Sequence, residues 1–372
     1  MKVVIVTPTY NERENIGRII ETVAGVAKEL STHDLILLVV DGNSPDGTSE
    51  YVTSLSKTYP FVHLLREKEK AGLGAAYVQG FKYGMTELNA DVLVEMDGDF
   101  QHDPKDIVKF VNAIEQGADY VIGSRYVSGG RIPKEWAFYR KFLSWGGSLF
   151  SKVVLGIFSI NDFTSGYKAS RVKGFVDKLD LDSIMSQGFA YKIDLLFKMH
   201  KIGAKFVEVP IVFGLRDRGD SKMEKGNFMD SLKVVILLRI RDNPSFFKFL
   251  VVGLVGLGVD LGLFNVLRVT LLSSEYASAF SGFIAMLTTY ILNNAWSFND
   301  RKINSLKGKL TSLPFYILVS YIPILLRSIL VKYSILYLGD TWYISNSAFF
   351  VGVLFGIAWN YTIYNKVIWR KK

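Results

Sequence analysis

Two aspartates separated by one glycine, Asp97-Gly98-Asp99, directly follow an apolar run in the first half of the 372-residue sequence, and Gln101 lies two residues further on. Carboxylates spaced in this way at a strand end can converge on one divalent cation, and the amide of Gln101 can add a neutral oxygen. Such oxygen ligands suit hard cations that leave room for substrate phosphates. The pattern predicts a Mg²⁺ or Mn²⁺ site at Asp97, Asp99 and Gln101.

Polar turn-forming residues also follow two earlier apolar runs. Thr7 to Glu12 come after the first run, and Asp41 to Thr48 come after the second. Each segment alone could be no more than a well-made turn. In an open α/β sheet, however, ligands bind outside the carboxyl ends of the strands. We therefore expect both segments to face the same ligand site as the aspartates.

The elements that must position these residues are short runs rich in branched apolar side chains, separated by helix-like stretches. This alternation predicts an α/β domain with a mainly parallel sheet covered by helices. The expected strands are Val3–Val6, Leu35–Val40, Val62–Leu65, Val92–Met96 and Tyr120–Ile122.

The second half of the sequence differs in composition. The whole chain is 49% hydrophobic and only 21% charged, and the apolar excess lies after Asn243-Pro244. Four apolar segments there reach the ~20 residues that a membrane-spanning helix needs. We expect an α/β domain at 1–225, an interfacial amphipathic helix and linker at 226–243, and an all-α domain of four transmembrane helices at 244–372. The expected spans are Phe246–Leu267, Tyr276–Phe298, Leu313–Leu338 and Tyr343–Ile368.

Basic residues indicate the orientation of these spans. Arg301, Lys302, Lys307 and Lys309 lie between the second and third spans, and Arg370, Lys371 and Lys372 end the chain. The positive-inside rule then predicts that the catalytic domain and both termini are cytoplasmic. The net charge of +9 fits an anionic membrane surface, so nucleic acid is not an expected partner. The absence of cysteine excludes disulfides and thiolate metal sites.

Several stretches of the first 225 residues form a set of motifs: Pro8–Asn15, Ser44–Thr48, Gly72–Ala76, Asp97–His102, Gly123–Tyr126, Phe138–Lys141, Asp162–Gly166 and Arg216–Lys222. Taken together, these motifs resemble those of glycosyltransferase family 2, and within it the polyprenyl-phosphate (dolichyl-phosphate) mannose synthases. The membrane half contains Phe249–Gly253 and Leu292–Phe298, through which it resembles the GtrA-type four-helix module.

This resemblance implies a GT-A fold, the fold of nucleotide-diphospho-sugar transferases, and hexosyl transfer from GDP-mannose to dolichyl or polyprenyl phosphate at the lipid bilayer. The implied catalytic residues are Asp99, Arg125 and Arg140. The implied acceptor-phosphate ligands are Arg125, Arg140, Arg216 and Lys222. The residues implied to bind the nucleotide-sugar are Pro8, Tyr10, Glu12, Val40, Asp41, Gly42, Asp97, Gly98, Asp99 and Gln101.

One departure from the family pattern concerns the nucleotide base. The family usually has two consecutive carboxylates after the second strand, and here those positions are Asp41 and Gly42. This departure leaves the nucleotide open, and two alternatives to the implied reaction also stay open at this point. One is transfer of glucose or another hexose to polyprenyl phosphate, and the other is a non-enzymatic protein that handles or flips lipids.

Overall fold

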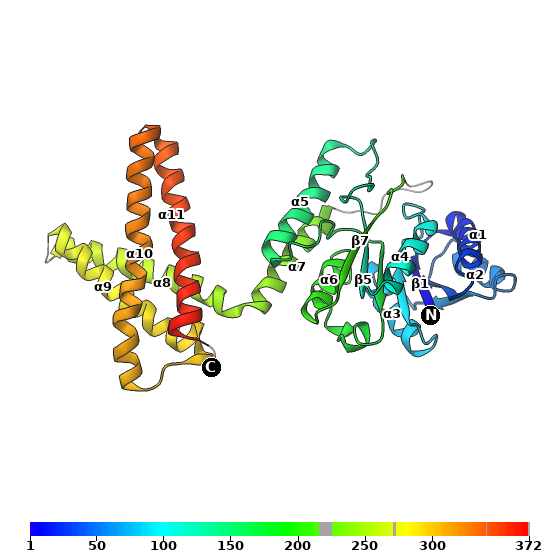
Figure 1. The fold of residues 1–372 in the computed structure, drawn as a ribbon, viewed down its shortest axis with the longest axis horizontal. Helices are drawn as coiled ribbons and strands as arrows, with labels where there is room; N and C mark the ends of the chain where they lie inside the picture. The colour runs from blue at the N-terminus through cyan, green and yellow to red at the C-terminus, as the bar shows by residue number, and fades with distance from the viewer. Residues whose placement is uncertain (216–224, 271–272, 340, 371–372) are drawn as a thin grey trace. The chain divides into compact units, whose positions relative to one another are not determined.

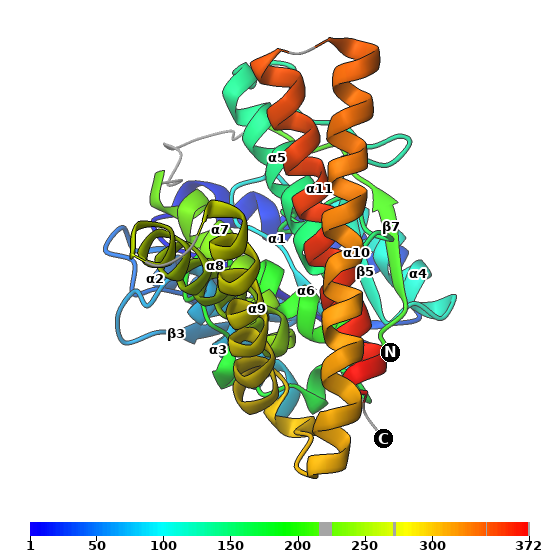
Figure 2. The ribbon, with the colours of Figure 1, turned by 90° about the vertical axis from the view of Figure 1, so that its left-hand side faces the viewer.

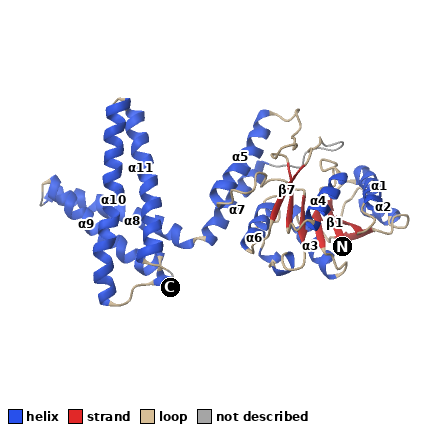
Figure 3. Ribbon diagram, viewed as in Figure 1, coloured by secondary structure: helices blue, strands red, loops and turns tan. Residues whose placement is uncertain are grey.

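The structure, a computed structural model, describes residues 1–215, 225–270, 273–339 and 341–370. The chain forms two compact units, Met1–Arg239 and Ile240–Lys372. The first contains all the strands and the second contains only helices within the described residues (Figure 3).

The first unit is built on a seven-stranded sheet with the order β3-β2-β1-β4-β6-β5-β7. Strand β6 runs antiparallel to its neighbours β4 and β5, and the other pairs are parallel. The strands are β1 (Lys2–Thr9), β2 (Asp34–Asp41), β3 (Val62–Arg66), β4 (Val92–Glu95), β5 (Tyr120–Ser124), β6 (Lys168–Arg171) and β7 (Phe206–Pro210).

Helices cover both faces of this sheet (Figure 1). One apolar core joins the sheet to α1, α2 and α4, and the other joins it to α3, α6 and part of α7. The helices of the first unit are α1 (Arg13–Glu29), α2 (Thr48–Leu55), α3 (Leu73–Thr86), α4 (Ile107–Glu115), α5 (Phe138–Leu155), α6 (Tyr191–Lys201) and α7 (Lys225–Asp242). Short 3₁₀ turns lie at η1 (Pro104–Asp106), η2 (Val176–Lys178) and η3 (Leu181–Ser183).

The apolar runs of the sequence form β1 to β5 because the central strands are buried on both faces. Val4 and Val6 pack into one core, whereas Val3 and Ile5 on the same strand pack into the other. A strand with two buried faces needs continuous rather than alternating hydrophobicity. The prediction of an α/β domain with a mainly parallel sheet is confirmed.

The carboxyl ends of β1, β2, β3 and β4 lie at the same edge of the sheet because these strands are parallel and in register. Thr9 pairs with Asp41, and Val6 pairs with Glu95. The chain leaves three of these strand ends through residues with positive φ, namely Asn11 at 55°, Asn43 at 57° and Phe100 at 61°. Asparagine tolerates this conformation, but it is strained for phenylalanine.

The second unit is helical (Figure 2). Helices α10 and α11 run side by side, as Figures 1 and 2 both show. Its elements are α8 (Pro244–Thr270), α9 (Ser274–Leu292), the π-turn η4 (Asn293–Ser297), η5 (Asn299–Arg301), α10 (Leu306–Leu338), α11 (Trp342–Ile363) and the π-turn η6 (Tyr364–Ile368).

Three segments of the described residues are long and apolar enough to cross a membrane: Pro244–Val269, Leu306–Leu338 and Trp342–Ile368. They correspond to the first, third and fourth expected spans. The second expected span, Tyr276–Phe298, falls on α9 and η4 and is not among these three segments. The structure thus supports three of the four spans.

Candidate functional site

A cleft of about 510 Å³ opens at the sheet edge where β1 to β4 end. Ten of the predicted site residues line it: Pro8, Tyr10, Glu12, Gly42, Asp97, Gly98, Asp99, Gln101, Arg125 and Arg140. Val40 and Asp41 do not line it. Arg216 and Lys222 lie outside the described residues.

Val40 and Asp41 are fully buried at the end of β2. The carboxylate of Asp41 accepts hydrogen bonds from the hydroxyls of Thr9, Ser44 and Ser49, at 2.9, 2.6 and 2.6 Å, and from the Ser44 N–H. A carboxylate with its acceptor sites filled in this way shapes a turn. Asp41 therefore orders the loop beside the cleft in this structure.

A carboxylate from another segment lies beside Gly42. A Cβ atom at position 42 would lie 3.4 Å from Oε2 of Glu67, which also lines the cleft. Glu67 is buried, and burial together with the nearby Asp41 raises the pKa of its carboxyl. Gln79 donates a hydrogen bond of 2.8 Å to Oε1 of Glu67. Glu67, which directly follows β3, thus brings a carboxylate into contact with the position where the family's second carboxylate is missing.

Asp97 lies among buried polar groups. The Tyr77 hydroxyl donates to its Oδ1 at 2.9 Å, and the Lys192 Nζ lies 3.6 Å from its Oδ2. Burial opposes ionisation of Asp97, but Lys192 and Tyr77 hold the pKa of the carboxyl below its ordinary value. The backbone N–H of Asp97 donates to Nδ1 of His102, whose pKa burial lowers to about 4. Asp97 is therefore an anion held beside a buried lysine.

Asp99 and Gln101 flank the strained Phe100 on the same wall. The Gln101 N–H donates to Oδ1 of Asp99 at 3.1 Å, and the Gln101 side-chain nitrogen donates to the Gly214 carbonyl at 3.3 Å. This arrangement leaves the amide oxygen of Gln101 available as a ligand. The oxygen donors at Asp97, Asp99 and Gln101 fit a hard divalent cation. Within the described residues, no three His, Asp or Glu side chains form a metal cluster.

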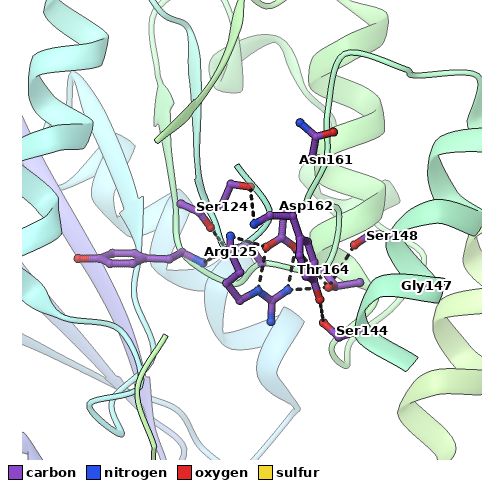
Figure 4. Close-up of polar contacts among 12 residues, drawn as sticks. Ser124, Arg125, Ser144, Gly147, Ser148, Asn161, Asp162 and Thr164 are labelled. Atoms are coloured by element: carbon purple, nitrogen blue, oxygen red, sulfur yellow. Dashed lines mark hydrogen bonds and ion pairs between the residues drawn. The ribbon is translucent and has the colours of Figure 1, made fainter. Parts of the chain in front are cut away.

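Arg125 also lines the cleft, and Asp162 holds it in place (Figure 4). Its Nε and Nη2 donate to the two carboxylate oxygens of Asp162 at 2.8 and 2.7 Å, and Nη2 also donates to the Thr164 hydroxyl at 2.7 Å. Glu208 on β7 accepts from the backbone N–H of Asp162 at 3.0 Å. Bidentate pairing fixes a guanidinium in both position and plane.

Burial by itself opposes ionisation of Asp162, but Arg125 outweighs it and holds the pKa of that carboxyl below its ordinary value. Arg125 gains from the same contact, which raises its own pKa despite burial. In the part of the chain that the structure describes, the second terminal nitrogen of Arg125, Nη1, has no hydrogen-bond partner. Arg125 thus presents a fixed positive charge to the cleft.

Arg140 stands nearer the cleft entrance, on the first turn of α5. Its guanidinium carbon lies 4.1 Å from the centre of the Trp136 ring, a cation–π contact. Beyond it the cleft wall becomes apolar, with Leu143, Phe228 and Leu232 among its lining residues. The outer face of α5 carries exposed apolar side chains three or four residues apart, at Phe138, Phe142, Trp145, Leu149 and Val153. A charged region and an apolar region therefore meet in one cleft.

Several cleft residues have no signal in the local sequence. Glu67 and Lys192 reach Gly42 and Asp97 only through the fold, 25 and 95 positions along the chain (67 − 42 and 192 − 97). Asp162 belongs to a quoted motif, but no spacing rule pairs it with Arg125. Arg125 directly follows the apolar strand β5 in the sequence. This position indicates a buried counter-charge, because an arginine is almost never buried alone.

The fold and cleft define an α/β ligand-binding domain joined to a helical membrane unit. Residues 4–175 match the family described as Glycosyl transferase family 2, and residues 248–369 match the GtrA/DPMS transmembrane domain. The chain belongs to glycosyltransferase family 2. It is a glycosyltransferase with a GT-A-like α/β domain followed by a membrane module, and it is an integral membrane protein.

Curated relatives agree with this assignment. A dolichol-phosphate mannosyltransferase of Pyrococcus furiosus is 34% identical over 372 residues, which cover 99% of each chain. An undecaprenyl-phosphate mannosyltransferase of Micrococcus luteus is 40% identical over 61% of this chain and 89% of its own. A polyprenol monophosphomannose synthase of Mycolicibacterium smegmatis is 39% identical over 62% and 84%, respectively.

Proposed function

We propose that this glycosyltransferase transfers mannose from GDP-mannose to dolichyl or another polyprenyl phosphate at the cytoplasmic face of the membrane. The observation that carries the proposal is the single cleft in which Asp97 and Asp99 lie with the arginines Arg125 and Arg140. Carboxylates suit a metal-bound donor diphosphate, whereas arginines suit an acceptor phosphate. The names of the curated relatives support the same reaction.

The donor would lie against Pro8, Tyr10 and Glu12, with its diphosphate near Asp97, Asp99 and Gln101. Mg²⁺ or Mn²⁺ held by those last three residues would neutralise the charge that develops on the departing GDP. Lys192 would add a buried positive charge on the same side of the cleft, since its ammonium already lies against Asp97.

The acceptor would place its phosphate between Arg125 and Arg140, and we include Arg216 and Lys222 in the same role. A phosphate monoester has a second pKa of about 6, so it is largely a dianion at neutral pH and needs no general base. In-line attack by a phosphate oxygen on the anomeric carbon forms the new sugar bond and releases the nucleoside diphosphate. Arg125 and Arg140 would hold the attacking phosphate oxygen in line with the anomeric carbon and offset the charge of the phosphate.

Glu67 offers an explanation for guanine as the base. The edge of guanine presents two adjacent N–H donors, which a single carboxylate can accept together in a fork. Uracil presents only one such donor on its corresponding edge. Glu67 lines the same cleft as Pro8 and Tyr10, and its carboxylate lies beside the position of the carboxylate absent at Gly42. We assign base selection to Glu67.

For the membrane unit we propose four transmembrane helices with both chain ends in the cytoplasm. Helix α9 is the additional span, and the hydroxyls of Ser281, Thr288 and Thr289 on it have hydrogen-bond partners, as polar side chains in a membrane helix require. The Ser281 hydroxyl on α9 donates to Asp260 on α8 at 2.5 Å. The exposed apolar face of α5 and the helix at 226–243 would lie along the lipid surface.

The reaction is tested with the purified full-length protein in detergent, dolichyl phosphate and a panel of labelled nucleotide sugars. We expect the label to become lipid-soluble with GDP-mannose and a divalent cation, and chelation to stop transfer. Asp99→Ala should reduce turnover at least about 100-fold, because a catalytic electrostatic contact is lost. Asp182→Asn, which changes an exposed carboxylate, is the matched control. Transfer of glucose instead of mannose, or full activity of Asp99→Ala, would refute the assignment.

Base selection is tested by inhibition with GDP and UDP. Glu67→Gln places an amide donor against a guanine donor and should weaken GDP binding by roughly 10- to 100-fold, as expected for a lost charge-assisted pair. Inhibition by UDP should change little. The exposed Glu69 provides the control Glu69→Gln, with the same change in charge. Equal losses for GDP and UDP would remove Glu67 from the base site.

A further inference from the structure

A second cavity, of about 800 Å³, lies wholly within the membrane unit. It opens at the end where α8 begins and where the chain leaves η4 and η6. Asn243, Ser245, Lys248, Ser297 and Lys366 are among its lining residues. None of its lining residues belongs to the catalytic cleft. Neither the sequence motifs nor the proposed reaction gives this cavity a role.

The cavity lies where two similar helical hairpins meet. The first hairpin consists of α8 and α9 and ends in the π-turn η4, and the second consists of α10 and α11 and ends in the π-turn η6. Each end carries a tyrosine, an asparagine and a large aromatic residue at four-residue intervals. These sets are Tyr290, Asn294 and Phe298 in the first hairpin and Tyr361, Asn365 and Trp369 in the second.

Reciprocal contacts join the two ends. The Trp369 indole N–H donates to the side-chain oxygen of Asn294 at 2.9 Å, and the Arg301 guanidinium donates to the side-chain oxygen of Asn365 at 2.7 Å. The rings of Phe298 and Trp369 stack with their centres 4.8 Å apart and an angle of 7° between them. The cavity is therefore built on a fixed junction, and sites at repeat junctions are common in membrane proteins.

The lining of this cavity has an excess of positive charge. Lys248, Arg301, Lys366 and Arg370 face two acids, Asp242 and Asp300. Arg301 pairs with Asp300 at 3.2 Å. Within the described residues, by contrast, Lys248 and Lys366 form no ion pair or hydrogen bond, and Lys248 only approaches the Trp296 ring at 5.9 Å. Two ammonium groups are thus available to a ligand.

Two further features point to an anion. The Ser297 side chain is only 2% exposed, and its hydroxyl has no hydrogen-bond partner among the residues described. The N-terminal end of the 27-residue helix α8 also meets the cavity at Asn243 and Ser245. A helix N-terminus carries partial positive charge, which favours phosphate.

We propose that this cavity binds the phosphate group of an anionic membrane lipid, at a site separate from the catalytic cleft. The phosphate belongs to a membrane lipid because of where the two lysines lie. Lys248 lies in the first turns of one candidate span, and Lys366 lies near the end of another. Both therefore fall at headgroup level, where basic pockets between membrane helices bind lipid phosphates. Lys248 and Lys366 contact the phosphate oxygens, and Ser297 donates a hydrogen bond.

The test measures ligand binding by thermophoresis of the full-length protein in detergent micelles. The probes are short-chain phosphatidic acid, the matching phosphatidylcholine and inorganic phosphate. The double variant Lys248→Gln/Lys366→Gln should weaken phosphatidic acid binding roughly 30-fold, from two lost lysine contacts at a membrane surface. The control Lys302→Gln/Lys307→Gln removes the same charge outside the cavity and should stay within about twofold, because salt screens distant charges.

Each outcome distinguishes the cavity from other sources of binding. Preference for phosphatidic acid over phosphatidylcholine, lost only in Lys248→Gln/Lys366→Gln, supports the proposal. Equal losses in Lys302→Gln/Lys307→Gln would mean general surface attraction and would overturn it. Loss in Arg140→Ala alone would place the lipid in the catalytic cleft, and binding of inorganic phosphate without the lipid would exclude a lipid ligand. None of these results depends on mannosyl transfer, and melting curves check that each variant is folded.

Discussion

Replacing Asp162 by asparagine would test whether Arg125 is fixed in place before an acceptor binds. The change keeps the size of the side chain but removes the charge that pairs with Nε and Nη2 of Arg125 at 2.8 and 2.7 Å. It also points an amide donor at one of the guanidinium donors. Asp162 is completely buried, and Arg125 is only 8% exposed, so water cannot replace the lost contact.

The expected loss of stability is about 3 kcal/mol, the lower end of the cost of breaking a buried ion pair. This corresponds to a fall of roughly 6–12 °C in the melting temperature of a unit of this size. The control is Asp182→Asn, which breaks the ion pair between Asp182 and Lys82. That pair is exposed, so its loss should cost less than about 1 kcal/mol.

The kinetic effect should fall on the acceptor. If Asp162 positions Arg125, then kcat/KM for polyprenyl phosphate drops roughly 10- to 150-fold in Asp162→Asn, because a charge-assisted contact of about 1.5–3 kcal/mol is misplaced. The KM for GDP-mannose should stay near the wild-type value. A variant that melts early but keeps wild-type acceptor kinetics would refute the positioning role, and one that melts normally would refute the buried pair.

The pH dependence provides a further check. The pKa of Asp162 is lower in the folded protein than in the unfolded chain. Its contribution to stability is therefore fully present above the ordinary carboxyl pKa of about 3.9 and is lost as pH falls through the folded value. The difference in stability between wild type and Asp162→Asn should be constant at neutral pH and should shrink in strong acid. A difference that grows as the pH falls would contradict this account.

Four other changes probe the acceptor site, the packing around the sheet and the membrane unit. Arg140→Ala should raise the KM for lipid phosphate about tenfold or more and leave that for GDP-mannose unchanged in steady-state assays, as for one lost charge-assisted contact. Gly80→Ala would force a Cβ against the side chain of Val6 and should lower stability by about 1–3 kcal/mol. Gly25→Ala, with no atom within 4 Å, should raise stability by up to about 1 kcal/mol in the same melting assay. Trp369→Leu removes a buried indole and its hydrogen bond and should destabilise the membrane unit by about 3 kcal/mol, the low end for a large aromatic truncation, measured by thermal aggregation in detergent.

The sheet could be predicted because its central strands are buried on both faces, and continuous apolar runs mark such strands. The five expected runs correspond to β1 to β5. Strands β6 and β7 were not predicted. Lys168–Arg171 in β6 carries polar and charged residues, and β7 is only half-buried. Their place in the sheet depends on pairing with distant strands, which local pattern does not encode.

The candidate site was predicted where it lies on loops that directly follow strands, as at Asp97 and Asp99. Asp41 shows the limit of this reasoning, because its position after β2 fits a ligand but its carboxylate is filled by neighbouring hydroxyls. Lys192 is a cleft residue that the local sequence does not indicate. It lies within α6 with no motif around it, and only the fold brings its ammonium against Asp97.

The reciprocal contacts between the two hairpin ends of the membrane unit also have an evolutionary consequence. Asn294 accepts a hydrogen bond from the indole of Trp369, and Asn365 accepts one from the guanidinium of Arg301. A change at either hairpin end therefore affects the other. A substitution at one of these four positions removes a partner that the opposite hairpin needs. Among homologues we expect these positions to vary together as one inherited set, whereas the lipid-facing positions between them drift independently.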